Sequence, residues 1–347
     1  MRIADFRSDL LTRPTQAMEA AMQAACRRPW SFDLREDPDQ RALESEIASM
    51  LGHQDALVMP TATMANEIAL MLHARPGDAV VAPADAHVAT SEAGAPAALA
   101  GVTLRLLDTH LPEAGAWEDA IGADSDALRA RVAALVLENT HNRAGGAAIA
   151  ADMSDSVLAI ARRKGIAAHL DGARLFNAAI ALGVSPDRLA RGFDTVCVSL
   201  NKGLGAPLGA VLAGSRALVA QALVLRQRLG GGIRPTALLA AAARVALASW
   251  QDLAQDHARA ARLCQALSRI PGFTPVRPAH PTNIVVARVE RPVAELVAAL
   301  AAQDVLVLPF GPNRIRFVLY RGITDADVGM AERACARIAA CDGAATP

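Results

Sequence analysis

The sequence has almost no lysine. Lys164 and Lys202 are the only lysines among 35 basic residues, so nearly every positive charge is carried by arginine. Lys202 lies beside glycines in the stretch Ser199-Leu-Asn-Lys-Gly-Leu-Gly-Ala-Pro207. A lysine kept against such a background indicates a position where an amine is needed.

Other absences exclude whole classes of protein. The chain of 347 residues has 35 acidic and 35 basic residues with no long run of one sign, which argues against nucleic acid or an anionic membrane as partner. Its five cysteines form no C-x-x-C pair and are odd in number, so we expect neither a disulfide framework nor a metal site. A charged beginning and the lack of a long apolar run predict a cytoplasmic protein that binds a small molecule.

The remaining pattern is typical of an α/β protein. From about residue 40, helical patterns alternate with short apolar runs that end at Gly, Pro, Asp or Asn. The predicted helices cover residues 41–51, 63–74 and 236–263, and the predicted strands cover residues 56–59, 79–82, 131–137, 166–170 and 195–199. Shorter strands at residues 272–276, 282–287, 305–308 and 315–319 indicate a small C-terminal α+β domain. We therefore predict a large domain over residues 1–250 and a small domain over residues 251–347.

Polar side chains follow the predicted strands at the point where each strand ends. Ligands of open parallel sheets bind outside the carboxyl ends of the strands, so these residues are candidates for a functional site. They are His87, Glu138, His141, Asp171, Arg174 and Lys202.

Lys202 and Asp171 together suggest a particular chemistry. A desolvated amine close to other cations is nucleophilic near neutral pH and forms a Schiff base with an aldehyde. Pyridoxal phosphate (PLP) is such an aldehyde, and it works as an electron sink only while a carboxylate keeps its pyridine nitrogen protonated. Asp171, at the end of a neighbouring strand, suits that role. Taken singly, the two residues are also explained as a surface lysine and a helix N-cap.

A cofactor phosphate has candidate partners as well. The turn Thr61-Ala62-Thr63 precedes a predicted helix, whose first backbone N–H groups can bind an anion. Arg234 follows a run of three glycines and is a candidate for a further phosphate contact, across a subunit interface. Threonines also cap many helices that bind no phosphate.

Three more residues are candidates for the cofactor ring and the substrate. His87 can lie flat on a pyridine ring. Arg174 and Arg316 belong to the two predicted domains, and a pair of arginines is suited to clamping an α-carboxylate. A turn histidine and structural ion pairs are the plainer explanations.

Dinucleotide binding is the rival interpretation of the glycines after Lys202. The spacing Gly203-x-Gly205-x-x-x-Gly209 is one residue too long, and Pro207 falls where the helix should begin. No acidic residue that could bind a ribose occurs between residues 211 and 250. The sequence therefore argues against a nucleotide.

A set of short motifs resembles the low-specificity L-threonine aldolases. In chain order they are Phe6-Arg-Ser-Asp9, Glu36-Asp-Pro38, Pro60-Thr-Ala-Thr-Met-Ala-Asn66, Asp85-Ala-His87, Leu137-Glu-Asn-Thr-His-Asn142, His169-Leu-Asp-Gly-Ala-Arg174, Lys202-Gly-Leu-Gly-Ala-Pro207 and Gly230-Gly-Gly-Ile-Arg234. The resemblance runs from residue 5 to about residue 320. It implies a PLP enzyme of the aspartate-aminotransferase-like fold (fold type I), with a mostly parallel seven-stranded sheet and a small C-terminal α+β domain.

The resemblance also implies a role for each candidate. Lys202 bonds the cofactor, Asp171 pairs with its pyridine nitrogen and His87 stacks on its ring. The full set of cofactor contacts is Thr61, Ala62, Thr63, His87, Asp171, Arg174, Asn201, Lys202 and Arg234. The substrate carboxylate is held by Ser8, Arg174 and Arg316. A homo-oligomer is implied too, typically a dimer of dimers with the active sites at the dimer interface.

The sequence departs from the family pattern at several positions. Thr61-Ala62-Thr63 replaces Ser-Gly-Thr, and Asn201 stands where a serine precedes the lysine. A histidine expected on the loop before Leu137 is absent at residues 126–130. Two further departures are Leu34-Arg35 in place of Tyr-Gly and Tyr320 in place of a histidine. They concern the surroundings of the substrate side chain, so the preferred β-substituent stays open.

The expected reaction is the reversible cleavage of L-threonine, L-allo-threonine or a related L-β-hydroxy-α-amino acid to glycine and an aldehyde. His87, His141 and a water near the phosphate are open candidates for the base that removes the β-hydroxyl proton. A phenylserine-type aldolase, β-elimination and transamination are alternatives on the same scaffold. A PLP-binding protein without catalysis is the alternative from a different class.

Overall fold

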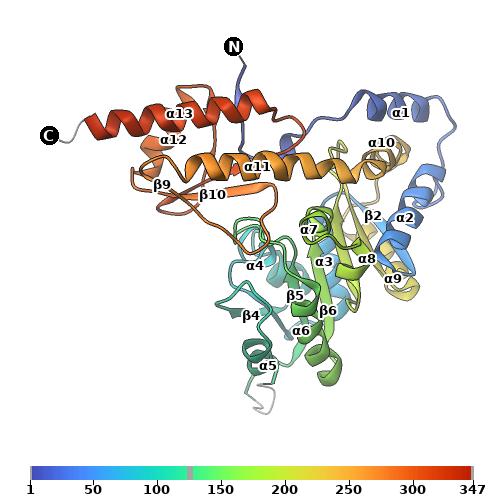
Figure 1. The fold of residues 1–347 in the computed structure, drawn as a ribbon. Coiled ribbons are helices and arrows are strands. Elements are labelled where there is room, and N and C mark those ends of the chain that lie inside the picture. Colours follow the sequence, from blue (N-terminus) through green and yellow to red (C-terminus); the bar gives the residue numbers. More distant parts are fainter. Residues whose placement is uncertain (1, 123–127, 345–347) are drawn as a thin grey trace.

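A seven-stranded sheet forms the centre of the molecule in the computed structural model, which describes residues 2–122 and 128–344 (Figure 1). The strand order is β2-β8-β7-β6-β5-β3-β4, and of these strands only β8 runs antiparallel to its neighbours. This confirms the predicted α/β fold with a mostly parallel sheet. The strands are β2 (Asp55–Met59), β3 (Ala79–Pro83), β4 (Thr103–Leu107), β5 (Val132–Glu138), β6 (Ala167–Gly172), β7 (Thr195–Ser199) and β8 (Ala210–Gly214).

Helices cover both faces of this sheet, which explains why its inner strands are continuous apolar runs. Ile47, Val157 and Leu175 belong to the buried cluster on one face, whereas Ile68 and Ala222 belong to the cluster on the other. The helices around the sheet are α2 (Pro38–Leu51), α3 (Ala62–His73), α4 (His87–Thr90), η2 (Pro96–Ala100), α5 (Ala114–Gly122), α6 (Ala151–Lys164), α7 (Leu175–Leu182), α8 (Pro186–Ala190) and α9 (Arg216–Arg228).

The single long helix predicted over residues 236–263 is wrong, because the structure has two helices there. α10 (Ala237–Ala248) packs against α1 (Gln16–Cys26) and α2, whereas α11 (Leu253–Leu267) packs against β10 and α13 of the C-terminal region. Ser249 leaves helical backbone at φ −117° and ψ 26°, and the 3-10 turn η4 (Trp250–Asp252) redirects the chain. The ring of Trp250 contacts Phe176 at 5.5 Å between centroids and anchors the bend.

A smaller antiparallel sheet lies in the C-terminal region, in the order β12-β13-β10-β9. Figure 1 shows α11, α12 and α13 beside this smaller sheet. The division at residue 250 stays a prediction. The elements are β9 (Phe273–Pro275), β10 (Ile284–Val289), α12 (Val293–Ala301), β11 (Val305–Leu306), β12 (Leu308–Pro309), β13 (Arg314–Val318) and α13 (Asp325–Ala344).

The first strand of the chain belongs, in space, to the C-terminal region. β1 (Ala4–Asp5) pairs in parallel with β11, and Phe6 packs edge-on against Phe317 with ring centroids 5.6 Å apart. The chain then enters the short turn η1 (Asp9–Leu11), whose Asp9 side chain is buried against the central sheet. The N-terminal segment thus connects the two sheets at the point where the candidate site lies.

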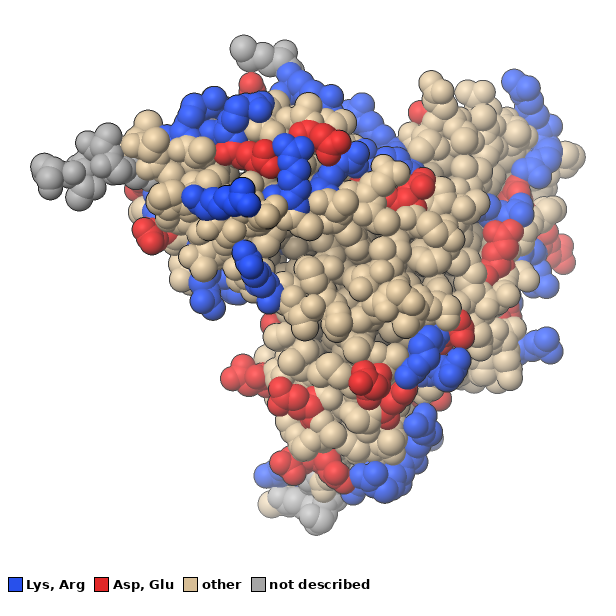
Figure 2. Space-filling model, in the orientation of Figure 1, with Lys and Arg blue, Asp and Glu red and all other residues tan. Residues whose placement is uncertain are grey.

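The surface agrees with the balanced composition. Figure 2 shows basic and acidic side chains interspersed on one face, with neutral residues between them. Within the described residues, no helix is both long and apolar enough to span a membrane.

Candidate active site

The carboxyl edge of the central sheet brings the predicted catalytic residues together. The strand register places Glu138 beside Asp171 across β5 and β6, and Asp171 beside Cys197 across β6 and β7. Lys202 lies in the loop after β7, where its charge interacts with that of Asp171. The lysine and the carboxylate that the sequence singled out are therefore neighbours.

Asn66, on the first turns of α3, organises the polar groups at this edge. Its Nδ2 donates to Asp171 Oδ2 and to Glu92 Oε1, both at 2.8 Å. Its Oδ1 lies 3.1 Å from Nε2 of the buried His169. Asn66 belongs to one of the sequence motifs, but its sequence context did not indicate this role, because the contacts span 26 to 105 residues.

Electrostatics keeps Asp171 ionised and makes Lys202 less basic. Burial alone would raise the pKa of Asp171, but the charges of His87 and Lys202 and the hydrogen bond from Asn66 hold it below its ordinary value. Burial and the nearby Arg174 guanidinium lower the pKa of Lys202. A carboxylate that stays negative and an amine that loses its proton more easily are the states that PLP chemistry requires.

His87 is fixed at the start of α4 by two glutamates. Its backbone N–H donates to Glu138 Oε2 at 2.7 Å, and its Nδ1 lies 2.7 Å from Glu92 Oε1. Burial lowers the pKa of His87, but the hydrogen bond to Glu92 and the charges of Asp171 and both glutamates raise it above its ordinary value overall. Glu92 occupies Nδ1, so Nε2 is the ring nitrogen left for other contacts.

Arg174 forms a buried ion pair that the sequence did not suggest. Its Nε and Nη2 donate to Asp9 Oδ2 and Oδ1 at 2.6 and 2.8 Å. Burial raises the pKa of Asp9, but the charge and hydrogen bonds of Arg174, together with the charges of Lys202 and Arg316, outweigh this effect and hold the pKa below its ordinary value. Two of the three guanidinium nitrogens are thus engaged by Asp9. The predicted contact of Arg174 with a substrate carboxylate stays a prediction.

Arg316 reaches the same edge from β13 of the C-terminal sheet. Its Nη1 donates to Asn142 Oδ1 at 2.9 Å and its Nη2 to the carbonyl of Arg7 at 3.2 Å. Its buried Nε has no hydrogen-bond partner among the described residues. Burial and the charge of Arg174 lower the pKa of Arg316 to about 10. A half-satisfied buried guanidinium beside a second arginine is a suitable place for an anion.

His141 lies deeper than the other histidine candidate. Its ring is fully buried, with Nε2 3.4 Å from Asp85 Oδ1, and the ring of His110 lies 5.5 Å away between centroids. In the part of the chain that the structure describes, neither ring nitrogen has a hydrogen-bond partner. His87 is the more accessible base, and the assignment of either residue stays a prediction.

The predicted phosphate turn forms the N-terminus of α3. Thr61 is the N-cap residue, and its hydroxyl accepts from the backbone N–H of Met64 at 3.0 Å. Ala62 and Thr63 lie in the first turn, where backbone N–H groups have no partner within the helix. The turn thus has the local structure that a phosphate site needs.

Three other candidates have local partners. The Ser8 hydroxyl accepts from the N–H of Leu10 at 3.2 Å, and the Ser199 hydroxyl donates to Asn201 Oδ1 at 2.9 Å. Arg234 is exposed, with its guanidinium over the ring of Phe32 at 5.4 Å. Its predicted cofactor contact stays a prediction that requires a second subunit.

The departures from the family pattern have structural partners of their own. Tyr320 donates its hydroxyl to the carbonyl of Asp5 at 3.0 Å, within the C-terminal core. Arg35 forms ion pairs with Glu44 and Asp55 at 2.7 and 2.5 Å. The missing loop histidine was expected at residues 126–130, of which 126 and 127 lie outside the described residues.

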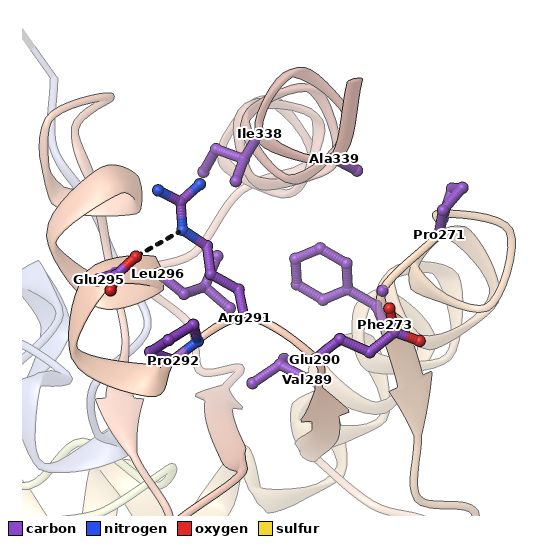
Figure 3. Close-up of a pocket in the computed structure, with 11 residues that line it drawn as sticks. Pro271, Phe273, Val289, Glu290, Arg291, Pro292, Glu295, Leu296, Ile338 and Ala339 are labelled. Carbon is purple, nitrogen blue, oxygen red and sulfur yellow. Dashed lines mark ion pairs between the residues drawn. The ribbon is translucent and has the colours of Figure 1, made fainter. Parts of the chain in front are cut away.

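Two other features are candidates for a functional site, namely a group of side chains with metal-ligand atoms and a cavity in the C-terminal region. Ligand atoms of His87, Glu92 and Asp171 lie within 4.8 Å of one another, but the Asn66 amide N–H groups already point at both carboxylates. A separate cavity of about 550 Å³ lies in the C-terminal region, where Arg291 contacts Glu295 at 3.6 Å (Figure 3). None of the candidate site residues lines that cavity.

Comparison with known proteins defines the class. A model of the beta-eliminating lyase family matches residues 5–290, which include the whole central sheet. Low-specificity L-threonine aldolase 1 of Arabidopsis thaliana is 38% identical, over 94% of this chain and 94% of that protein. Low specificity L-threonine aldolase of Escherichia coli (strain K12) is 34% identical, over 87% and 90%. The chain belongs to the beta-eliminating lyases and, within them, to the low-specificity L-threonine aldolase family, which confirms the predicted resemblance.

Solved structures confirm the fold. Threonine aldolase of Leishmania major superposes with a TM-score of 0.85 at 20% identity, covering 96% of this chain and 99% of that one. Serine palmitoyltransferase of S. paucimobilis, solved with bound PLP, gives a TM-score of 0.74 at 17% identity, covering 98% and 88%. The predicted PLP fold type I is therefore correct.

The residues present fit PLP. The pKa values of Asp171 and Lys202 are both lowered, and the first backbone N–H groups of α3 have no partner within the helix. The buried Nε of Arg316, on β13 of the C-terminal sheet, has no hydrogen-bond partner among the described residues. These features match the ring nitrogen, the aldehyde, the phosphate and an anionic substrate in turn.

Proposed function

We propose that this chain uses PLP to cleave L-threonine, L-allo-threonine or a related L-β-hydroxy-α-amino acid reversibly to glycine and an aldehyde. The observation that carries the proposal is the approach of Lys202, the ionised Asp171 and the arginine pair to one sheet edge. Relatives that match nearly the whole chain bear the name of this reaction.

Each cofactor group has a partner in the chain. When bound, PLP supplies an electron sink for the pair of electrons released as the Cα–Cβ bond breaks. Lys202 would bond its aldehyde carbon, and Asp171 would keep the pyridine nitrogen protonated. His87 would lie against the ring. The turn of Thr61, Ala62 and Thr63 would bind the phosphate, together with Arg234 of a second subunit. Asn201 would contact the cofactor close to the lysine.

The substrate carboxylate is bound by cations. Arg316 offers its Nε, Arg174 its remaining nitrogen, and Ser8 its hydroxyl. Fixing the carboxylate restricts rotation about the bonds to Cα, so one bond is selected for cleavage. Asp9 holds Arg174 in place for this task.

The β-hydroxyl proton needs an acceptor. Glu92 binds Nδ1 of His87, which leaves Nε2 as the atom that would accept the proton. The carboxylates around His87 raise its pKa and so stabilise the imidazolium that forms. His141 and a bound water are the other candidates. His141 is fully buried, so we favour His87.

A product assay tests the reaction. Threonine, allo-threonine, phenylserine and serine should be compared, and we expect glycine and the matching aldehyde from the β-hydroxy amino acids. A keto acid without glycine would indicate transamination or β-elimination instead. Bound chromophore with no turnover of any substrate would indicate a non-catalytic PLP-binding protein.

The two lysines provide a matched pair of variants. Lys202→Ala should lose the visible absorbance of lysine-bound PLP and lose turnover, because the sequence offers no second lysine at the sheet edge. Lys164→Ala, at the end of α6, should keep both. Unchanged absorbance in Lys202→Ala would refute the cofactor assignment.

Assembly and compartment are also part of the proposal. We infer a cytoplasmic homotetramer built from two dimers. A subunit interface is supported by the exposed aromatic residues Trp30 (51% exposed) and Phe32 (84% exposed), of which Phe32 has its ring against Arg234. Light scattering would measure the mass. Arg234→Ala should weaken PLP binding without changing the fold of a subunit, and a monomer with full activity would contradict this inference.

A further inference from the structure

A second buried glutamate lies behind the contact between His87 and Glu92. Glu67 is on α3, directly after Asn66, and is 1% exposed. Within the described residues, neither of its carboxyl oxygens has a hydrogen-bond donor as partner, and Glu92 Oε2 has none either. Three buried carboxyl oxygens without a donor are unusual, because an unsatisfied buried acceptor costs free energy.

The two carboxyl groups are partners for each other. Glu67 faces Glu92 within hydrogen-bonding reach. If both were ionised, two negative charges would meet in a medium of low dielectric constant and neither could donate. A single proton turns the contact into an O–H···O hydrogen bond. Burial, then the contact with Glu92, raises the pKa of Glu67 to about 9.

The charges around the pair favour the same state. Glu92 contacts the ring of His87 and the amide of Asn66, and Asp171 and the Cys197 thiol lie nearby. Glu138 and Lys202 lie one residue further out, beside His87 and Asp171 respectively. Burial raises the pKa of the Cys197 thiol well above its ordinary value, so this residue is neutral. An ionised Glu67 would add an anion that no described cation approaches.

We propose that Glu67 and Glu92 share one proton as a buried acid pair, and that the one negative charge left on the pair orients the Nδ1–H of His87. Glu67 is then a positioning residue, since it acts on the reacting atoms only through Glu92 and His87. With Nδ1 holding a hydrogen, Nε2 carries the lone pair that can accept a proton. The effect on His87 rests on the proposed function, whereas the shared proton does not.

Infrared spectroscopy of the purified full-length protein detects the proton directly. At about pH 8, the wild type should show the C=O band of a protonated buried carboxylic acid. At that pH, Asp256, whose pKa burial raises to about 7, is mostly ionised. Glu67→Gln should remove the band. Glu44→Gln should keep it, because Glu44 is equally buried but is paired with Arg35.

Two infrared results would overturn the proposal. One is a wild type without the band, and the other is a band that Glu67→Gln leaves unchanged. Elemental analysis adds a third, since one equivalent of a metal that a chelator removes would mean that a cation, rather than a proton, lies between the carboxylates.

The pH dependence of stability is a second, independent measurement. The native state keeps a proton on Glu67 that the unfolded chain loses near its ordinary pKa of 4.5. The native state therefore binds more protons between about pH 5 and pH 9, and its stability falls as the pH rises through that window. The melting temperature of the wild type should decline relative to Glu67→Gln over this range. A constant difference between the two proteins would contradict the shared proton.

Turnover then tests the effect on His87. A glutamine side chain in place of Glu67 can still donate a hydrogen bond to Glu92, whereas a leucine side chain cannot. Glu67→Gln should therefore keep most of kcat, and Glu67→Leu should lose about tenfold in kcat with little change in KM. In the wild type we expect kcat to fall as Glu67 loses the shared proton near pH 9, and this fall should be absent in Glu67→Gln. Equal kcat values in the two variants would refute the positioning role. A wild type without any turnover would remove the proposed function and leave the infrared result standing.

Discussion

At the carboxyl edge of the central sheet charged side chains are buried, whereas on helices α11 and α13 of the C-terminal region several of them pair at the surface. Asp9, Asp171 and Arg174 are all at most 9% exposed, but Arg262 and Glu332 pair in the open on α11 and α13. Burying an ion costs several kcal/mol unless a partner compensates it. The edge therefore carries a cost in stability that the surface pairs on α11 and α13 avoid, and such an arrangement indicates function.

The largest expected difference concerns catalysis. Asp171→Asn removes the charge that would keep the pyridine nitrogen protonated, so we expect kcat to fall by at least about a hundredfold. Asp325→Asn changes an exposed aspartate on α13 that pairs with Arg259, and it should leave kcat unchanged. Steady-state kinetics measures both. If the kcat of Asp171→Asn stays within about tenfold of the wild-type value, the two regions differ less in their importance for catalysis than we infer.

The next difference concerns stability. Asp9→Ala leaves Arg174 buried without its partner, so we expect a loss of about 3–5 kcal/mol in the free energy of unfolding. Asp5→Ala breaks the half-exposed pair with Arg7 and should cost about 0–1 kcal/mol. Urea denaturation measures both values. Equal losses would show that burial does not set the strength of these pairs.

A smaller effect is expected for substrate binding. Arg316→Lys keeps the charge but loses the planar donors, so we expect KM to rise about tenfold with a smaller change in kcat. Arg288→Lys, on the neighbouring strand β10, should change neither value, because Arg288 is exposed. An unchanged KM in Arg316→Lys would remove this residue from the carboxylate site.

The smallest effect is the response of stability to pH. Burial lowers the pKa of His169 to about 4. His169 therefore stays neutral in the native state, whereas in the unfolded chain it binds a proton below about pH 6.5. The unfolded state thus binds more protons, and stability falls as the pH drops, by roughly 1–2 kcal/mol from pH 7 to pH 5. His169→Gln should reduce this slope in calorimetry. His257 on α11 has the same direction of shift and accounts for part of what remains.

The meeting of Lys202, Asp171 and His87 was predictable because it follows a rule. Asp171 lies at the end of a buried strand, Lys202 and His87 lie in the segments after two others, and the ends of parallel strands meet at one edge. The α/β fold followed from the alternation of apolar runs with helical patterns. The break at Ser249 was not predictable, since the alanine-rich pattern continues through it and packing against two different layers decides where it falls.

The supporting residues could not be predicted for a physical reason. Asp9 pairs with a residue 165 positions away, and Asn66 reaches Asp171 over 105 positions. Glu67 looks like an ordinary polar residue of a helix until α3 is packed against the sheet. Local patterns carry no information on such partners, because the contacts exist only in the folded chain.

The pairing of β1 with β11 has a consequence for how the protein is made. Ala4 lies opposite Val305, so about three hundred residues must leave the ribosome before the first strand finds its partner. Long-range pairing of this kind forms late, because a large loop must close first. Ser8 and Asp9 reach the sheet edge only then. A nascent chain that already holds Lys202 and Asp171 is thus still unable to complete its site until β11 has been synthesised.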